Sequence, residues 1–229
     1  MSKLRKNFTL SEFQNLISEI YGLPDDRLFS LWDLISNQER FTMRALKGIR
    51  KGEKTKLAGN LLVGTSWLMA VANRLHINVE EVVWRRFHGT CSYCKRIPCV
   101  CKKEKHLKRI IVINSKKEIK PESLADFQDM FFKIYPPNSR TLSDAGVHLA
   151  EETGELSEAV HVFLGEHKAD EFSRIEDEIA DYISCIFGVA NSAQIDISRE
   201  LFVMYRNNCH VCHKAPCVCS FSSVARYKL

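Results

Sequence analysis

The chain has 229 residues, of which 45% are hydrophobic and 27% are charged, an ordinary composition for a soluble globular protein with one large or two small domains. The net charge of +5 permits a polyanionic substrate without requiring a nucleic-acid partner. No apolar run approaches the roughly 18–20 residues of a membrane span, and the N-terminal residues lack the apolar segment of a signal peptide, so we expect a cytoplasmic protein.

The first hundred residues carry apolar side chains at helical spacing, which predicts amphipathic helices. The positions are Leu31, Leu34, Ile35, Leu57, Leu61, Leu62, Leu68 and Val71. A basic segment separates two of these helical patterns. It contains Lys47, Arg50, Lys51, Lys54 and Lys56, and it is either a solvated loop or a contact for phosphates bound elsewhere in the chain.

A four-cysteine cluster closes this region at residues 91–101, and residues 102–121 form a lysine-rich linker. Within the linker, the β-branched run at residues 110–113 predicts one short strand or an extended packed segment. Glu122 or Ser123 is expected to cap the helix that follows.

A helix is predicted from Leu124 to Tyr135, because two prolines follow it and cannot continue it. Its aromatic residues, Phe127, Phe131 and Tyr135, form either a core stripe or a surface for stacking on a base. Arg140 lies in the turn beyond, where it is either a phosphate contact or an ordinary surface residue. The next helix is expected to begin at Thr141 or Ser143.

Residues 148–190 contain two helical patterns whose apolar stripes are interrupted by carboxylates. Glu152 falls inside the first stripe with Glu155 at its edge, and Glu178 and Asp181 take similar positions on the second. No Lys or Arg lies on either stripe to neutralise them. Unpaired carboxylates in a core are costly, so we predict a bound hard cation, Mg²⁺ or Mn²⁺. The alternative is that both helices simply present solvated faces.

The end of the chain shows that its sequence is duplicated. Residues 189–219 match residues 71–101 without a gap at an offset of 118, and residues 124–135 match residues 10–21 at an offset of 114. We therefore predict two copies of one unit, residues 1–101 and residues 122–229.

The first copy has lost every acidic position of the second. Glu151, Glu152 and Glu155 correspond to Asn37, Gln38 and Phe41, whereas Glu178 and Asp181 correspond to Asn60 and Val63. Since the apolar pattern survives, the first copy is expected to serve as a silent packing partner. The other interpretation is that it diverged under weak selection.

The sequence Glu151-Glu152-x-x-Glu155, followed by Glu178-x-x-Asp181, resembles the motif of the MazG-type all-α nucleoside-triphosphate pyrophosphohydrolases. Gly154, before Glu155, and the link at Gly165 fit as well, and the resemblance covers Leu124 to about Asn207. It implies a four-helix fold that assembles as dimers and uses Mg²⁺ to split a nucleoside triphosphate into monophosphate and pyrophosphate.

Applied to this chain, the resemblance implies an all-α fold in which two tandem copies pack as a pseudo-dimer, with further homodimerisation possible. The metal ligands would be Glu152, Glu155, Glu178 and Asp181, and Glu151 or Glu152 would be the catalytic base. Candidate substrate-binding residues are Arg140, Lys168, Arg174, Arg206 and Asn207. The preferred base and the biological role stay open.

Eight cysteines form two clusters of identical spacing, which predicts structural zinc sites in a reducing compartment. The clusters are Cys91, Cys94, Cys99 and Cys101, and Cys209, Cys212, Cys217 and Cys219. Shared ligands and an iron–sulfur cluster are the alternatives. Such knuckles also occur in nucleic-acid-binding proteins, so an adaptor with a vestigial nucleotide-binding core is the rival function. Cys185 is expected to be a plain core residue.

Overall fold

The computed structural model describes residues 4–104 and 119–229, and these residues form helices and loops without a strand. The all-α prediction is therefore confirmed, whereas the expected strand at residues 110–113 lies outside the described residues. The helices are α1 (Leu10–Leu28), α2 (Leu31–Lys51), α3 (Lys54–Arg74), α4 (Val79–Phe87), α5 (Leu124–Ile134), α6 (Leu142–Glu166), α7 (Ala169–Ala193), α8 (Ile197–Met204) and α9 (Phe221–Arg226), with a 3₁₀ turn η1 (Pro137–Ser139).

Local sequence explains where the helices begin. Thr9, Ser30 and Thr141 are N-caps, and each forms a reciprocal capping box with an acidic residue three positions later. Ser123 caps α5, as the sequence predicts. Because these side chains satisfy free N–H groups at the helix ends, they fix the starts of four helices.

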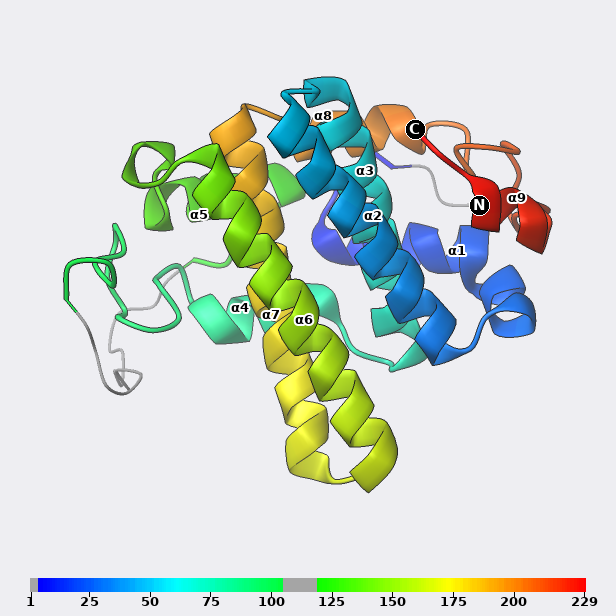
Figure 1. Cartoon of the computed structure of the whole chain (residues 1–229), viewed down its shortest axis with the longest axis horizontal. Helices are drawn as coiled ribbons and strands as arrows, with labels where there is room; N and C mark the ends of the chain where they lie inside the picture. The colour runs from blue at the N-terminus through cyan, green and yellow to red at the C-terminus, as the bar shows by residue number, and fades with distance from the viewer. Residues whose placement is uncertain (1–3, 105–118) are drawn as a thin grey trace.

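Two long helical hairpins, α2–α3 and α6–α7, pack against each other and form the centre of the molecule (Figure 1). Gly48 allows the close approach of α2 to α3, since a Cβ there would lie 2.8 Å from the Leu57 backbone nitrogen. The shorter helices cross over: α4 packs against α7, whereas α8 packs against α3 and α5. Figure 1 shows the far end of the α6–α7 hairpin extending beyond the other helices.

The same polar contact recurs in both parts of the chain. Gln14 on α1 donates to Asn73 Oδ1 at 3.0 Å and to the Ile77 carbonyl at 2.7 Å. Gln128, at an offset of 114, donates to Asn191 Oδ1 at 2.9 Å and to the Ile195 carbonyl at 2.7 Å. The sequence match between these segments is therefore accompanied by a match in their contacts.

The core is continuous across both parts. Its largest fully buried side chains include Phe13, Phe41, Phe127, Phe131 and Tyr182. Phe127 and Phe131 are therefore core residues, as expected if the aromatic stripe of α5 packs in the core and does not stack on a base. None of the described helices combines the length and apolar character that crossing a membrane requires.

Candidate functional site

Three of the predicted carboxylates meet between α6 and α7. Oxygens of Glu152, Glu178 and Asp181 all lie within 4.8 Å of one another, and each residue is half-buried. The i, i+3 spacing places Glu178 and Asp181 on one face of α7, and the antiparallel α6 brings Glu152 opposite them. Three oxygen ligands at this spacing could hold a hard divalent cation.

An arginine from the other part of the chain reaches this cluster. The guanidinium of Arg86, on α4, donates from Nε to Asp181 Oδ1 at 3.2 Å and from Nη1 to Asp177 Oδ2 at 2.5 Å. The Arg86 side chain is 9% exposed and that of Asp181 is 14% exposed. The sequence analysis missed Arg86 because it searched for compensating charge on the two acidic helices alone.

One guanidinium leaves the cluster with excess negative charge. Burial, followed by the charges of Asp181, Glu155 and Glu178, raises the pKa of Glu152 to about 8, against the opposing effect of Arg86. Burial, Asp181 and Glu155 likewise raise the pKa of Glu178 to about 7. Glu152 Oε2 is buried and has no hydrogen-bond partner among the described residues. A cation at this position would supply the missing partner.

The other predicted acidic residues lie at the edge of the cluster. Glu155 is exposed and is not among the three residues that meet within 4.8 Å, although its charge acts on both Glu152 and Glu178. Glu151 is exposed on α6. Their roles as metal ligand and catalytic base stay predictions.

Arg140 is held beside the cluster by the shape of α7. Its Nη2 atom lies 2.0 Å from where a Cβ on Gly188 would be, so the guanidinium fills the space that the glycine leaves. The group is 5.5 Å from the Tyr135 ring centroid. Its Nε and Nη2 atoms are buried without a hydrogen-bond partner in the described part of the chain. A cation with free donors suits an anionic ligand, the phosphate contact that is one of the two interpretations of Arg140 in the sequence.

The remaining candidate substrate contacts differ in their distance from the cluster. Arg174 lies 3.9 Å from Glu178 and 3.5 Å from Glu158. Lys168 is exposed at the start of α7, where it pairs with Glu166. Arg206 and Asn207 are exposed just after α8, the helix that packs against α3 and α5. The structure thus brings Arg174 to the cluster. Arg206 and Asn207 follow α8, whereas the short helix that packs against α7 is α4.

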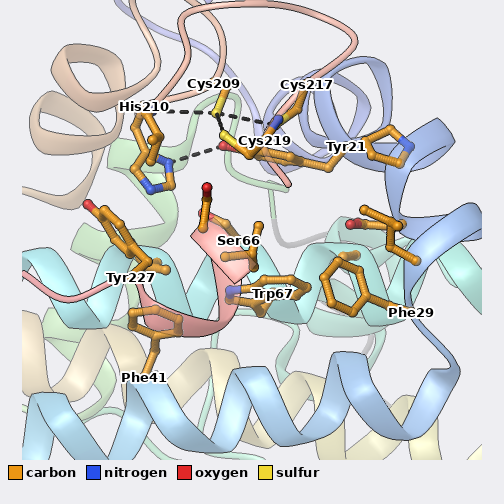
Figure 2. A pocket seen from close by; sticks show the side chains of 18 of the residues that line it. Tyr21, Phe29, Phe41, Ser66, Trp67, Cys209, His210, Cys217, Cys219 and Tyr227 are labelled. Carbon is orange, nitrogen blue, oxygen red and sulfur yellow. Dashed lines mark hydrogen bonds between the residues drawn. The ribbon is translucent and has the colours of Figure 1, made fainter. Parts of the chain in front are cut away.

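The corresponding positions of the first part of the chain carry no carboxylate. Gln38 is fully buried and donates to Thr42 Oγ1 at 3.1 Å, and Thr42 Oγ1 also hydrogen-bonds to the Tyr182 hydroxyl at 2.7 Å. Phe41 and Val63, which correspond to Glu155 and Asp181, line a cavity (Figure 2). These positions thus contribute to packing and to a cavity wall.

Each cysteine cluster is complete by itself. The Sγ atoms of Cys91 and Cys101 are 3.8 Å apart, and those of Cys212 and Cys217 are 3.7 Å apart. Tetrahedral zinc with bonds of about 2.3 Å requires sulfur–sulfur distances of about 3.8 Å. All nine cysteines are free of disulfides, and buried Cys185 lies outside both clusters. Each cluster could therefore bind a metal such as zinc without sharing ligands.

The clusters contact the helices of the opposite part of the chain. The Cys99 backbone N–H donates to the Ile134 carbonyl at 2.8 Å, and the Cys217 N–H donates to the Ile20 carbonyl at 2.7 Å. The Tyr135 hydroxyl, at the end of α5, donates to Cys91 Sγ at 3.6 Å. Each cysteine loop is thus docked on a helix from the other part of the chain, the loop of Cys99 on the end of α5 and the loop of Cys217 on the interior of α1.

Comparisons with known proteins gave no match, whether to a family model, to a curated protein or to a solved structure. The functional argument therefore depends on the residues and their geometry.

Proposed function

We propose that this chain is a Mg²⁺-dependent nucleoside-triphosphate pyrophosphohydrolase of the MazG type, which releases a monophosphate and pyrophosphate. The observation that carries the proposal is the cluster of Glu152, Glu178 and Asp181, with the unpartnered Oε2 atom of Glu152. The sequence resemblance names these same residues as metal ligands. Their oxygens fit a hard cation in number, spacing and charge.

The residues divide into ligands and substrate contacts. Glu152, Glu178 and Asp181 would hold Mg²⁺ or Mn²⁺, with Glu155 as the fourth ligand. The metal would neutralise phosphate charge and lower the pKa of the attacking water. Glu151 or Glu152 would accept the proton of that water. Arg140 and Arg174 would bind phosphate oxygens.

We also propose that the chain is a tandem pseudo-dimer, with a degenerate copy at residues 1–101 and an acidic copy at residues 122–229. The support is reciprocal: the Gln14 contacts recur at Gln128, and the Cys99–Ile134 hydrogen bond recurs as Cys217–Ile20. Zn²⁺ bound by each cysteine cluster would hold the docked loops in shape.

The test is a panel of ribo- and deoxyribonucleoside triphosphates assayed for pyrophosphate release with Mg²⁺. We expect activity on at least one of them, and a loss of two or more orders of magnitude in Asp181→Asn and Glu155→Gln. Glu158→Gln is the matched control, since this exposed carboxylate lies on the same helix and only pairs with Arg174 at the surface. Full turnover in Asp181→Asn would refute the proposal. Absence of turnover together with cluster-dependent RNA binding would favour the adaptor.

A further inference from the structure

A cavity lies between α1, α2 and α3 of the first half and residues 205–227 of the second half, beside the second cysteine cluster (Figure 2). Its volume is about 70 Å³. Four of its lining residues correspond by sequence offset to residues at or beside the cluster. The pairs are Phe41 and Glu155, Val63 and Asp181, Trp67 and Cys185, and Ala70 and Gly188. Apolar and aromatic groups thus replace the acidic and small ones.

Aromatic rings from several segments surround this space. Phe41 comes from α2, Trp67 from α3 and Tyr227 from the segment after α9, and all three line the cavity. The Phe41 and Tyr227 ring centroids are 6.1 Å apart, and Phe29 stands perpendicular to Trp67 at 5.5 Å. Ring faces on several sides favour a flat aromatic ligand, because stacking adds to apolar burial.

A buried carboxyl is among the polar groups that line the cavity. Asp25 on α1 is 7% exposed and lines the cavity. Burial raises the pKa of Asp25 to about 7, with the charge of Arg74 opposing and that of Asp26 assisting. A carboxylate accepts hydrogen bonds and a protonated carboxyl also donates one, which matches the donors and acceptors on the edge of a nucleobase.

The surroundings exclude a metal-bound triphosphate. The positions of Glu155 and Asp181 are filled by Phe41 and Val63, so the metal ligands are missing. The nearby arginines are already engaged: Arg40 Nη1 donates to the Ala225 carbonyl at 2.7 Å, and Arg44 Nη1 donates to the Tyr227 carbonyl at 2.8 Å. These bonds hold the C-terminal segment in place as one wall of the cavity.

We propose that this cavity is a second, non-hydrolytic site that binds the base of a free nucleobase or nucleoside without a metal ion. The choice of a nucleobase as the ligand rests on the proposed function, because the acidic half would hydrolyse nucleotides that carry such bases. The rings of Phe41, Trp67 and Tyr227 contact the base, and the Asp25 carboxyl contacts its edge. The copy that lost its carboxylates is in this way a binding module rather than only a packing partner.

The test uses Trp67 as the reporter in the full chain. Trp32→Phe and Trp84→Phe remove the other two tryptophans, and adenine, cytosine, uracil and guanosine are titrated without Mg²⁺. We expect a saturable change in Trp67 emission with at least one probe. Ala70→Leu fills the cavity and Tyr227→Ala removes one wall, so each should weaken binding by about tenfold or more. Ala125→Leu, an exposed substitution on α5, is the control.

Two results would overturn the proposal: no saturable change with any probe, or equal affinity in the parent chain and in both cavity variants. Asp181→Asn separates this site from the acidic one. Base binding that persists in Asp181→Asn supports a site in the first half, whether or not the chain hydrolyses triphosphates. Binding that disappears in this variant would assign the signal to the acidic cluster and refute the second site.

Discussion

The acidic cluster of α6 and α7 and the aromatic cavity beside α2 and α3 correspond only in part. Val63 of the cavity takes the position of Asp181, whereas Gln38 and Asn60, at the positions of Glu152 and Glu178, do not line the cavity. Both halves keep the glutamine contacts to the neighbouring loop and the docked cysteine cluster. They differ where Glu152 and Asp181 stand in one half and Gln38 and Val63 in the other. The features that both halves share connect helices and loops, whereas the positions that differ are those of the acidic residues that could bind a metal.

The difference extends to the helix that crosses over from the opposite half. Arg86 on α4 forms an ion pair with Asp181 on α7. At an offset of 118, Arg86 corresponds to Met204 on α8, and Asp181 corresponds to Val63 on α3. This charged pair thus corresponds to two apolar residues. The acidic cluster is therefore formed by both halves, because the positive charge of Arg86 comes from the first half.

Separating the halves should have the largest effect. An isolated 122–229 fragment loses Arg86 and the packing of α4 on α7, which exposes a buried apolar surface. At about 25 cal/mol per Å², a few hundred Å² is worth several kcal/mol, as much as a small domain's whole stability. We expect the fragment to aggregate, unfold or self-associate in sedimentation experiments. Adding residues 1–121 in trans should restore a soluble complex, and a monomeric, active fragment would contradict the comparison.

Removing metal from the cysteine clusters should affect both halves alike. Elemental analysis should find about two zinc ions per chain if each cluster binds one. Cys209→Ser should lower that number to about one and reduce the yield of folded protein, since metal binding contributes directly to folding. Cys185→Ala, outside the clusters, should keep both metals. A brown protein that contains iron and labile sulfide would show that the clusters bind an iron–sulfur centre and not zinc.

Arg86→Met places methionine at position 86, as at the corresponding position 204. Two aspartates then lose their buried partner, which should lower the free energy of unfolding by about 3 kcal/mol. Mg²⁺ can replace the lost positive charge, so it should raise the melting temperature more in this variant than in the parent chain. An equal Mg²⁺ effect in both would show that Arg86 and the metal do not act on the same carboxylates. Arg85→Met, at the more exposed neighbour, is the control.

The pH dependence of stability should report the raised pKa values of the acidic cluster, to which buried Asp25 in the first half adds a contribution of the same sign. The pKa values of Glu152 and Glu178 are raised from 4.5 to about 8 and about 7, so the folded chain holds protons that the unfolded chain has released. The free energy of unfolding without Mg²⁺ should therefore fall as the pH rises from about 5 to 8, by about 1–2 kcal/mol after solvent screening. Urea titrations should show a flatter profile in Glu152→Gln. A profile as steep as that of the parent chain would show that the raised pKa of Glu152 does not contribute.

Gly188→Ala should have the smallest effect on stability. The new methyl group displaces the Arg140 guanidinium, while the gain in helix propensity of about 1 kcal/mol offsets the strain. We expect a melting temperature within a few degrees of the parent value and a several-fold rise in KM for the triphosphate, with kcat little changed. Gly165→Ala, which has open space around it, is the matched control.

Local sequence patterns were sufficient for much of this molecule. Caps, periodicity and prolines predict where helices such as α5 and α6 begin and end, and the carboxylates of the cluster follow from helical spacing. Contacts between distant segments could not be found in this way. Neither periodicity nor composition shows that Arg86 faces Asp181, that Arg140 fills the space at Gly188, or that the C-terminal segment forms α9 and covers a cavity.

The crosswise docking of the cysteine loops has a consequence for synthesis on the ribosome. The loop around Cys99 leaves the ribosome before its hydrogen-bond partner Ile134, and Cys217 reaches back to Ile20 across nearly the whole chain. Neither half can complete its native contacts until the other has emerged. Contacts of such long sequence separation slow folding, because loop closure costs entropy before the contact forms. The nascent first half must therefore wait with its docking surface uncovered, a stage at which chaperones would recognise it.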